Sequence, residues 1–386
     1  MFVRVSGASS SRPSLPSLRD AARAWATRGE WYYASHFTDN APYLPYQAVS
    51  IASGNGERYT DGCGPGKDRE DVLRLRWRFN GSSSPRLPRF PVWDRDAACA
   101  VLKGSTVVVL GDSMSGEFYD ALVSSLWDPS EPRRFRVPWV RVCGDTVNVT
   151  MMFATFGFPG SSQTALVQEA NAAPGARVFP FPNEIGDDPL RFIIDAAYSA
   201  ESASPGSRFF VVLNRGAWMD NLGADASFST INTVHVTQVN AFVKAVRAAV
   251  PRARIFWRTT NLGHPLCQHT RTASPLTAPP TAAEYALADT TPDSFYKAKY
   301  RWDNVFLQNE ATIAALPDFV SVVDVAPSTA LRRDSHPLFK YDKKQRPDCL
   351  HYCLPGPIDT WVLLWTAMLR YEQRPWQRAF FDAAPE

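Results

Sequence analysis

One short segment restricts the fold of this chain more than any other. Residues 105–110 read Ser-Thr-Val-Val-Val-Leu, a continuous run that is typical of a strand buried on both faces. The turn Gly111-Asp112-Ser113 follows directly, and apolar residues then recur at helical spacing from Met114 to Trp127. A strand, a tight turn and a helix in this order predict a β–α corner of an α/β protein, with Ser113 at its tip.

Further along the chain, short apolar runs alternate with helical patterns. We expect strands at 209–213, 255–257 and 319–325, and helices at 236–250 and 302–313. Strands that alternate with helices predict a mainly parallel sheet that is covered on both faces. In such sheets, ligands bind beyond the carboxyl ends of the strands.

The sequence divides into four parts. Residues 1–24 are rich in Ser and Pro and predict a flexible leader, with little order before Ala21. Residues 25–96 are rich in aromatic side chains but have few periodic runs, which predicts an irregular layer without a sheet of its own. Residues 97–375 carry the α/β pattern and end in a helix that places Trp361, Leu364 and Met368 on one side, and 376–386 are a C-terminal tail.

Composition and charge exclude several classes of protein. The 386 residues include 41 basic and 38 acidic side chains, and a net charge of +3 is too small for a nucleic-acid-binding surface. No window approaches the roughly 18 apolar residues of a membrane span, and residues 1–7 lack the apolar core of a signal peptide. Phosphate and dinucleotide binding have no support, because no Walker-type loop and no Gly-x-Gly-x-x-Gly occurs. The sequons at Asn80 and Asn148 are weak evidence for glycosylation.

Ser113 is the first candidate for chemistry. A serine at a strand-to-helix turn lies at the edge of the sheet, and its backbone N–H can help bind an oxyanion. The simpler interpretation is that Asp112 and Ser113 only cap the helix. Asp348-Cys349-Leu350-His351 favours a catalytic role, because a carboxylate three residues before a histidine can orient its imidazole. The order Ser113, Asp348, His351 is one that builds a triad on α/β sheets.

Two further residues are candidates for an oxyanion site. Asn214 ends the predicted strand 209–213 and can donate an amide N–H, although a turn asparagine is as good an interpretation. Gly144, in Val142-Cys143-Gly144-Asp145, can offer a backbone N–H, but a plain turn explains it better.

The six cysteines are compatible with three disulfides and also with six thiols. The segment from Cys349 to Cys353, with His351 between them, has thiol and imidazole ligands close together, and Cys267, His264 and His269 are possible partners for a zinc site. However, the paired C-x-x-C of most zinc sites is missing. We therefore expect no bound metal.

These motifs together resemble a known family. Gly111-Asp112-Ser113, Asn214 in Asn-x-Gly-x-Trp, and the 14-residue stretch from Asp348 to Trp361 are similar to the PC-esterase group of the SGNH/GDSL superfamily. More closely, the chain resembles the trichome birefringence-like polysaccharide O-acetyltransferases, and the resemblance extends from about residue 29 to residue 369. It implies a three-layer α/β/α fold of the SGNH-hydrolase type.

The resemblance also implies roles for individual residues. Ser113 would be the acetyl-accepting nucleophile, His351 the general base and then acid, Asp348 the residue that orients it, and Asn214 the oxyanion donor by its position. The family's cysteines are oxidised in a secretory lumen. This suggests the pairs Cys63–Cys353, Cys267–Cys349 and Cys99–Cys143.

Two positions depart from the family pattern. The segment after Ser113 usually contains Arg and Asn, whereas this chain has Glu117 there. The aromatic residue after the catalytic histidine is Tyr352 instead of Trp. Glu117 alters the local charge and leaves the identity of the acceptor sugar open, whereas Tyr352 keeps an aromatic wall and adds a hydroxyl.

The resemblance implies an O-acetyltransferase that moves an acetyl group through a Ser113 acyl-enzyme to a hydroxyl of a cell-wall or extracellular polysaccharide. No bound cofactor is expected, only an acetyl donor such as acetyl-CoA as co-substrate. By the same resemblance, the compartment is the Golgi lumen or secretory pathway. The alternatives are a carbohydrate O-acetyl esterase with the same triad, and a catalytically inactive carbohydrate-binding protein.

Overall fold

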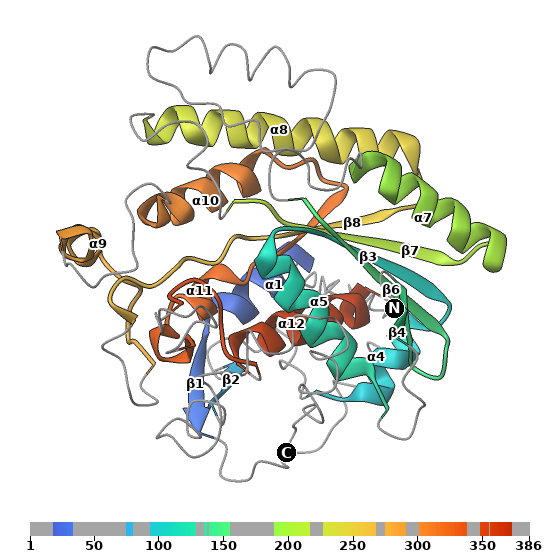
Figure 1. Cartoon of the computed structure of the whole chain (residues 1–386), viewed down its shortest axis with the longest axis horizontal. Coiled ribbons are helices and arrows are strands. Elements are labelled where there is room, and N and C mark those ends of the chain that lie inside the picture. The colour runs from blue at the N-terminus through green and yellow to red at the C-terminus, as the bar shows by residue number, and fades with distance from the viewer. Residues whose placement is uncertain are drawn as a thin grey trace, which may run out of the picture.

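Figure 1 shows the computed structural model of this chain. It describes residues 18–33, 75–79, 93–128, 135–136, 139–154, 189–216, 227–267, 275–290, 301–337, 348–354 and 356–372.

A seven-stranded sheet forms the centre of the described part of the chain. Its strand order is β4-β5-β6-β3-β7-β8-β9. The pairs among β6, β3, β7, β8 and β9 are parallel, whereas β4–β5 and β5–β6 are antiparallel. The strands are β3 (Ser105–Gly111), β4 (Phe135–Arg136), β5 (Trp139–Val142), β6 (Val147–Phe153), β7 (Arg208–Leu213), β8 (Arg254–Arg258) and β9 (Val320–Val323). The prediction of a mainly parallel sheet is therefore confirmed.

Strand β3 lies in the middle of the sheet because its side chains suit both faces. All seven of its residues are buried. Val107 and Val109 point into the core on one face, and Val108 and Leu110 into the core on the other, as the alternation of a strand requires. A run of apolar residues without polar alternation is thus explained by helices on both sides.

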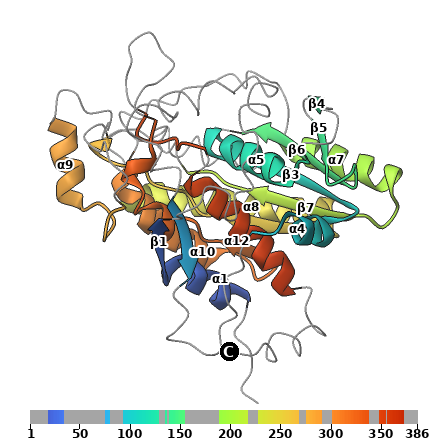
Figure 2. The ribbon, with the colours of Figure 1, turned by 90° about the horizontal axis from the view of Figure 1, so that it is seen from below.

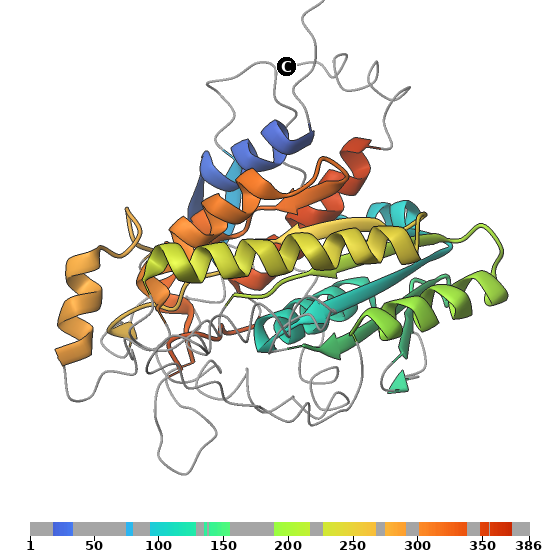
Figure 3. The same cartoon turned by 90° about the horizontal axis from the view of Figure 1, so that it is seen from above.

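Helices cover both faces of the sheet, which gives the three layers that the resemblance implied. On one face lie α7 (Pro189–Ala203) and α8 (Phe228–Ala249), with α10 (Val305–Ala315) beside α8 (Figure 3). On the other face lie α1 (Leu18–Thr27), α4 (Arg95–Leu102), α5 (Ser113–Leu126) and α12 (Pro357–Glu372), as Figure 2 shows. The predicted last helix is α12, and Trp361, Leu364 and Met368 are buried in it. The shorter elements are α9 (Ala282–Thr290), η5 (Trp302–Asn304), α11 (Ala326–Thr329) and η6 (Arg333–Ser335).

Strand β6 was not predicted, although it pairs with β3. Asn148 and Thr150 interrupt its apolar run, so the sequence shows neither a continuous buried strand nor a helix. Asn148 is paired in register with Thr106 on one side and Arg141 on the other, and the Thr150 side chain is buried. The Asn148 sequon therefore lies inside the sheet and not in an exposed loop, where glycosylation acceptors are expected.

The N-terminal region differs from the prediction in two ways. Helix α1 begins at Leu18, so the predicted flexible leader (1–24) is wrong for residues 18–24. The stripe Ala21, Ala22 and Trp25 is buried in the same core as α12, which explains why this segment is helical. The layer 25–96 also has a two-stranded antiparallel sheet, β1 (Gly29–Tyr33) with β2 (Leu75–Phe79), where an irregular layer was expected.

The aromatic residues of this small sheet are used in packing. Trp31 lies opposite Trp77, and their ring centroids are 5.4 Å apart. The Trp77 indole N–H donates to the carbonyl of Trp25, 2.9 Å away, and that of Trp31 donates to the carbonyl of Ser328, 3.0 Å away. The small sheet is thus attached to α1 and α11.

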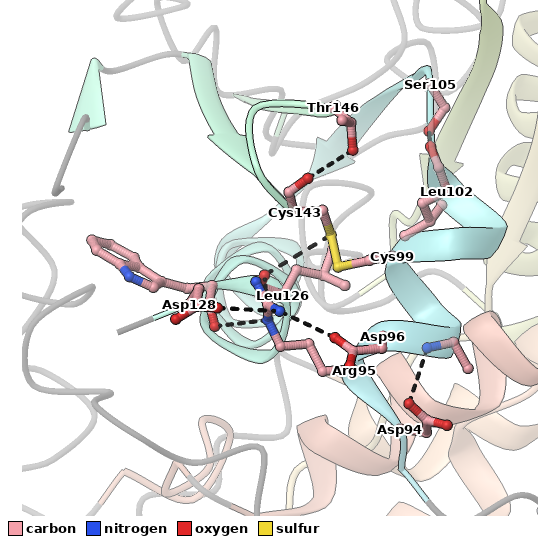
Figure 4. Close-up of a disulfide and its surroundings, with 12 residues drawn as sticks. Asp94, Arg95, Asp96, Cys99, Leu102, Ser105, Leu126, Asp128, Cys143 and Thr146 are labelled. Carbon is pink, nitrogen blue, oxygen red and sulfur yellow. Dashed lines mark hydrogen bonds and ion pairs between the residues drawn. A yellow bond between two sulfur atoms is a disulfide. The ribbon is translucent and has the colours of Figure 1, made fainter. Parts of the chain in front are cut away.

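Two of the predicted disulfides are confirmed. Cys99–Cys143 joins α4 to the turn between β5 and β6 (Figure 4), and Cys267–Cys349 joins the segment after β8 to the segment before α12. Cys353 is also disulfide-bonded, but its predicted partner Cys63 lies outside the described residues. Near the first bridge, the Arg95 guanidinium donates to the carbonyls of Leu126 and Trp127, which ties α4 to the end of α5 (Figure 4).

We predict that each of the two described bridges contributes to stability through the unfolded chain. The sequence separations are 44 and 82 residues, for which loop-closure entropy gives about 4 kcal/mol in each case. Replacing Cys99 and Cys143 by serine, or Cys267 and Cys349 by serine, should therefore lower the free energy of unfolding by similar amounts. Urea unfolding followed by tryptophan fluorescence measures this, and an unchanged midpoint in either variant would contradict the prediction.

Candidate active site

The β3–α5 corner places Ser113 at the carboxyl edge of the sheet. Asp112 is the N-cap of α5, and its carboxylate accepts the backbone N–H of Met114 at 3.0 Å. The capping interpretation is therefore correct for Asp112, while Ser113, at the first position of the helix, is left half-buried. A side chain on Gly111 would lie 2.4 Å from the carbonyl oxygen of Asn214, so only glycine allows β3 and β7 to approach this closely.

The structure brings Ser113, His351 and Asp348 together. The Ser113 Oγ and His351 Nε2 are 2.7 Å apart, and the His351 Nδ1 and Asp348 Oδ2 are 2.8 Å apart. The other carboxylate oxygen of Asp348 accepts the backbone N–H groups of Leu350 and His351. Asp348 therefore fixes the imidazole with one oxygen and the loop backbone with the other.

The loop that carries Asp348 and His351 is attached to its surroundings at several points. The Cys267–Cys349 bridge holds one side of it. The backbone N–H of Asp348 donates to the carbonyl of Pro337 at 3.0 Å, and that of Cys353 donates to the carbonyl of Ser335 at 2.7 Å. Since the loop has no regular secondary structure, these contacts take the place of a helix or strand in setting its position.

Arg258 is a buried charge near the corner, to which the sequence interpretation gave no role. It ends β8, is 1% exposed, and donates to the Ser115 Oγ at 3.2 Å. Its guanidinium lies 4.6 Å from the ring centroid of Trp361. Burial lowers the pKa of Arg258 to about 10, so it stays charged at neutral pH. A charged residue at the end of the apolar run 255–257 was the signal that could have marked it.

Two buried carboxyl groups lie in the field of Arg258. Burial raises the pKa of Asp112, and the Arg258 charge partly offsets this effect. Burial also raises the pKa of Glu117 well above its usual value. Glu117 accepts the backbone N–H of Tyr352, with distances of 3.1 and 3.3 Å to its two oxygens. Glu117 and Tyr352, the two positions that depart from the family pattern, are therefore hydrogen-bonded to each other.

Asn214 and Gly144 differ in how well the structure fits their predicted role. Asn214 lies at the expected edge, immediately after β7, but its Nδ2 donates to the carbonyl of Arg258 at 2.8 Å and to the Thr260 Oγ1 at 3.1 Å. To donate to an oxyanion, the Asn214 amide would have to give up one of these two hydrogen bonds. Gly144 precedes β6, whose first residue Val147 pairs with Ser105 at the amino end of β3. It is separated from Ser113 by the length of β3, roughly 20 Å for seven residues, so the oxyanion prediction for Gly144 is wrong.

The zinc interpretation loses two of its ligands, because Cys267 and Cys349 are oxidised with each other. Within the described ranges, no group of three or more His, Cys, Asp or Glu side chains is arranged to hold a metal ion. The same part of the chain contains no helix that is long and apolar enough to cross a membrane.

Comparison with known proteins agrees with the motifs. Residues 216–368 match the PC-Esterase family, a GDSL/SGNH-like acyl-esterase family found in Pmr5 and Cas1p. Xyloglucan O-acetyltransferase 1 of Arabidopsis thaliana is 43% identical over 70 residues, which are 16% of this chain and 17% of that protein. Protein trichome berefringence-like 7 of the same plant is 23% identical over 303 residues, 77% of this chain and 64% of that protein.

The chain thus spans less than two thirds of the length of either relative. A solved SAR1-type GTPase from Encephalitozoon cuniculi covers 72% of this chain and 86% of its own, at 11% identity and a TM-score of 0.27, too low to inform the fold. Residues 216–368 are therefore similar to the PC-esterase family, and the chain as a whole is similar to a trichome birefringence-like protein.

Proposed function

We propose that this protein is a polysaccharide O-acetyltransferase that works through an acetyl-enzyme on Ser113. The observation that carries the proposal is the hydrogen-bonded series Ser113 Oγ, His351, Asp348, with distances of 2.7 and 2.8 Å. A nucleophile bonded to a base that is itself oriented by a carboxylate is the arrangement used for acyl transfer.

The reaction has two half-reactions that use the same groups. In the first, the Ser113 hydroxyl proton moves to His351 Nε2 while Oγ bonds to the acetyl carbonyl carbon of the donor. The donor's leaving group departs with that proton. In the second, a sugar hydroxyl gives its proton to His351 and attacks the acetyl carbon, and the proton returns to Ser113 as the acetyl group leaves. Asp348 keeps the Nδ1 proton of His351 in place throughout.

The start of α5 supports this chemistry electrostatically. The backbone N–H of the first residue of a helix has no intrahelical partner, so the Ser113 N–H is available to a developing oxyanion. Asn214 is the second proposed donor, by turning one N–H away from its present acceptor. The positive end of the α5 dipole acts in the same direction.

The name of one relative supports a polysaccharide acceptor, because that protein is called a xyloglucan O-acetyltransferase. A net charge of +3 suits an uncharged sugar chain better than a polyanion. An acetyl donor such as acetyl-CoA is the proposed co-substrate. Disulfides persist in oxidising compartments, which supports a secretory location such as the Golgi lumen.

An O-acetyl esterase is the second candidate, because the matched family is named for acyl-esterases and the triad itself does not select sugar over water. A catalytically inactive binding protein is the third candidate, but the intact contact between Ser113 and His351 argues against it.

The first test separates these candidates. We predict that Ser113→Ala removes acetyl release from 4-nitrophenyl acetate and that a phosphonate labels Ser113 in the folded wild type. With cell-wall oligosaccharides added, mass spectrometry should find acetylated sugar in place of free acetate. Free acetate alone would favour the esterase. Full activity of Ser113→Ala would contradict an acetyl-enzyme on this serine, whether sugar or water then accepts the acetyl group.

The two disulfides provide a second, matched test. Removal of either bridge is predicted to cost similar stability. However, only Cys349 is adjacent to Asp348, whereas Cys143 lies at the opposite end of β3. We predict that loss of Cys267–Cys349 lowers kcat at least tenfold at a temperature where both variants are folded, since a 1 Å displacement can cost about 100-fold. Loss of Cys99–Cys143 should leave kcat nearly unchanged, and equal losses would contradict a positioning role.

The third test concerns Asn214. As an oxyanion donor, Asn214 should be worth about 10²–10³ in kcat, so Asn214→Ala is predicted to lower kcat by that factor with little change in KM. If Asn214 only ties β7 to β8, the same variant should instead lower the free energy of unfolding and leave kcat within a few fold. Steady-state kinetics and urea unfolding of the variant distinguish the two.

A further inference from the structure

The peptide group between His351 and Tyr352 is held at both of its polar atoms by buried side chains. Its N–H donates to the Glu117 carboxyl group, at 3.1 and 3.3 Å from the two oxygens. Its carbonyl oxygen, on His351, lies 2.6 Å from His336 Nδ1, which donates to it. A peptide group fixed in this way cannot rotate freely, and its carbonyl carbon is bonded to the Cα atom that carries the His351 side chain.

Glu117 connects this peptide to the helix of the nucleophile. It lies four residues after Ser113 in α5, so the two side chains are on neighbouring positions of one helix face. Glu117 is 0% exposed, and its titratable neighbours are Asp120, Arg258, Asp348 and His351. Both the carboxylate and the protonated acid have an oxygen that accepts the N–H, so the contact exists in either form.

His336 is itself fixed from the side away from His351. Its Nε2 lies 2.7 Å from His264 Nδ1, and His264 Nε2 lies 2.8 Å from the carbonyl of Ala330. The His336 ring stacks on the ring of Tyr352, with centroids 4.4 Å apart and an interplanar angle of 30°. Both histidines are completely buried. His336 is therefore a rigid donor, in a segment of the chain different from that of Glu117.

We propose that Glu117 and His336 are positioning residues for the general base, acting through the 351–352 peptide group to hold His351 Nε2 against the Ser113 hydroxyl. This inference rests on the proposed function of Ser113 and His351. The two contacts act from opposite sides: Glu117 sets the distance of the peptide from α5, and His336 sets its rotation. Neither side chain touches the reacting atoms.

The test compares variants that keep one hydrogen bond with variants that lose it. Glu117→Gln keeps an acceptor for the Tyr352 N–H, whereas Glu117→Leu fills the space without one. In His336→Asn the amide nitrogen takes the place of Nδ1, and in His336→Gln it takes the place of Nε2, too far along the side chain for the His351 carbonyl. We expect Glu117→Gln and His336→Asn to keep kcat within a few fold, and Glu117→Leu and His336→Gln to lower it ten- to 100-fold with KM little changed.

Combining Glu117→Leu with His336→Gln should lower kcat by less than the product of the two single effects, because both act on one peptide group.

His235→Gln is the matched control. His235 is also a completely buried histidine, but it lies in α8 and contacts Trp257, in the core on the other face of the sheet. Its replacement is expected to lower stability without lowering kcat. If Glu117→Leu does not fold, Glu117→Asp, which shortens the side chain by one methylene, replaces it.

The outcomes separate this inference from the proposed function. If Ser113→Ala and His351→Ala are inactive while Glu117→Leu and His336→Gln keep wild-type kcat, the positioning role is overturned and the proposed function stands. Activity in Ser113→Ala would overturn the function itself. Equal loss of kcat in the Gln and Leu variants of Glu117, in step with their loss of stability in urea, would also overturn the inference, since it would show a packing role only.

Discussion

The hydrogen bond between Ser113 and His351 joins residues that are 238 positions apart in the chain. It depends on the contacts that hold the two backbone segments in place. A contact of 2.7 Å between two side chains tolerates little displacement of either backbone. Ser113 is positioned by regular structure, because β3 is buried on both faces and α5 is capped by Asp112. His351 lies on a loop without such support and depends on a disulfide and on individual hydrogen bonds.

These supporting contacts require polar and charged groups inside the protein. Asp112, Glu117 and Arg258 are almost completely buried, and such groups are costly to remove from water unless they are paired or hydrogen-bonded. A core of apolar residues in the same volume would cost less. However, an apolar side chain can neither accept the Tyr352 N–H nor donate to Ser115. These buried polar groups are therefore best explained by the geometry that they impose on the site, although they lower the stability of the fold.

The sequence predicted best the parts of the fold that depend on local patterns. β3, β7, β8 and β9 are apolar runs, and the corner at Ser113 and the Asp348–His351 spacing are local motifs. β6 could not be recognised, because its Asn148 and Thr150 are accommodated by neighbours on both sides that the sequence does not reveal. Gly144 was misplaced for a related reason, since a turn motif does not show at which end of the sheet it lies.

Contacts between distant segments that no motif marks were beyond prediction for the same physical reason. The sequence showed Glu117 and Tyr352 only as two separate departures from a pattern, but in the structure they bond to each other. Arg258 was assigned no role at the end of the apolar run 255–257, yet it is the buried cation beside α5. The identity of each residue was visible, whereas its partner depends on how β8, α5 and the loop before α12 meet.

The N-terminal layer belongs to the same structural unit, because it supports the segment that contains His336. The Trp31 indole bonds to the carbonyl of Ser328, and the Arg332 guanidinium lies 4.4 Å from the centroid of the Trp31 ring. Arg332 forms a completely buried ion pair with Asp334, two residues before His336. Loss of the small β1–β2 sheet would expose this pair to water and loosen its geometry. Trp31 and Trp77, in the aromatic-rich segment 25–96, therefore pack the N-terminal layer against the domain that holds Ser113, Asp348 and His351.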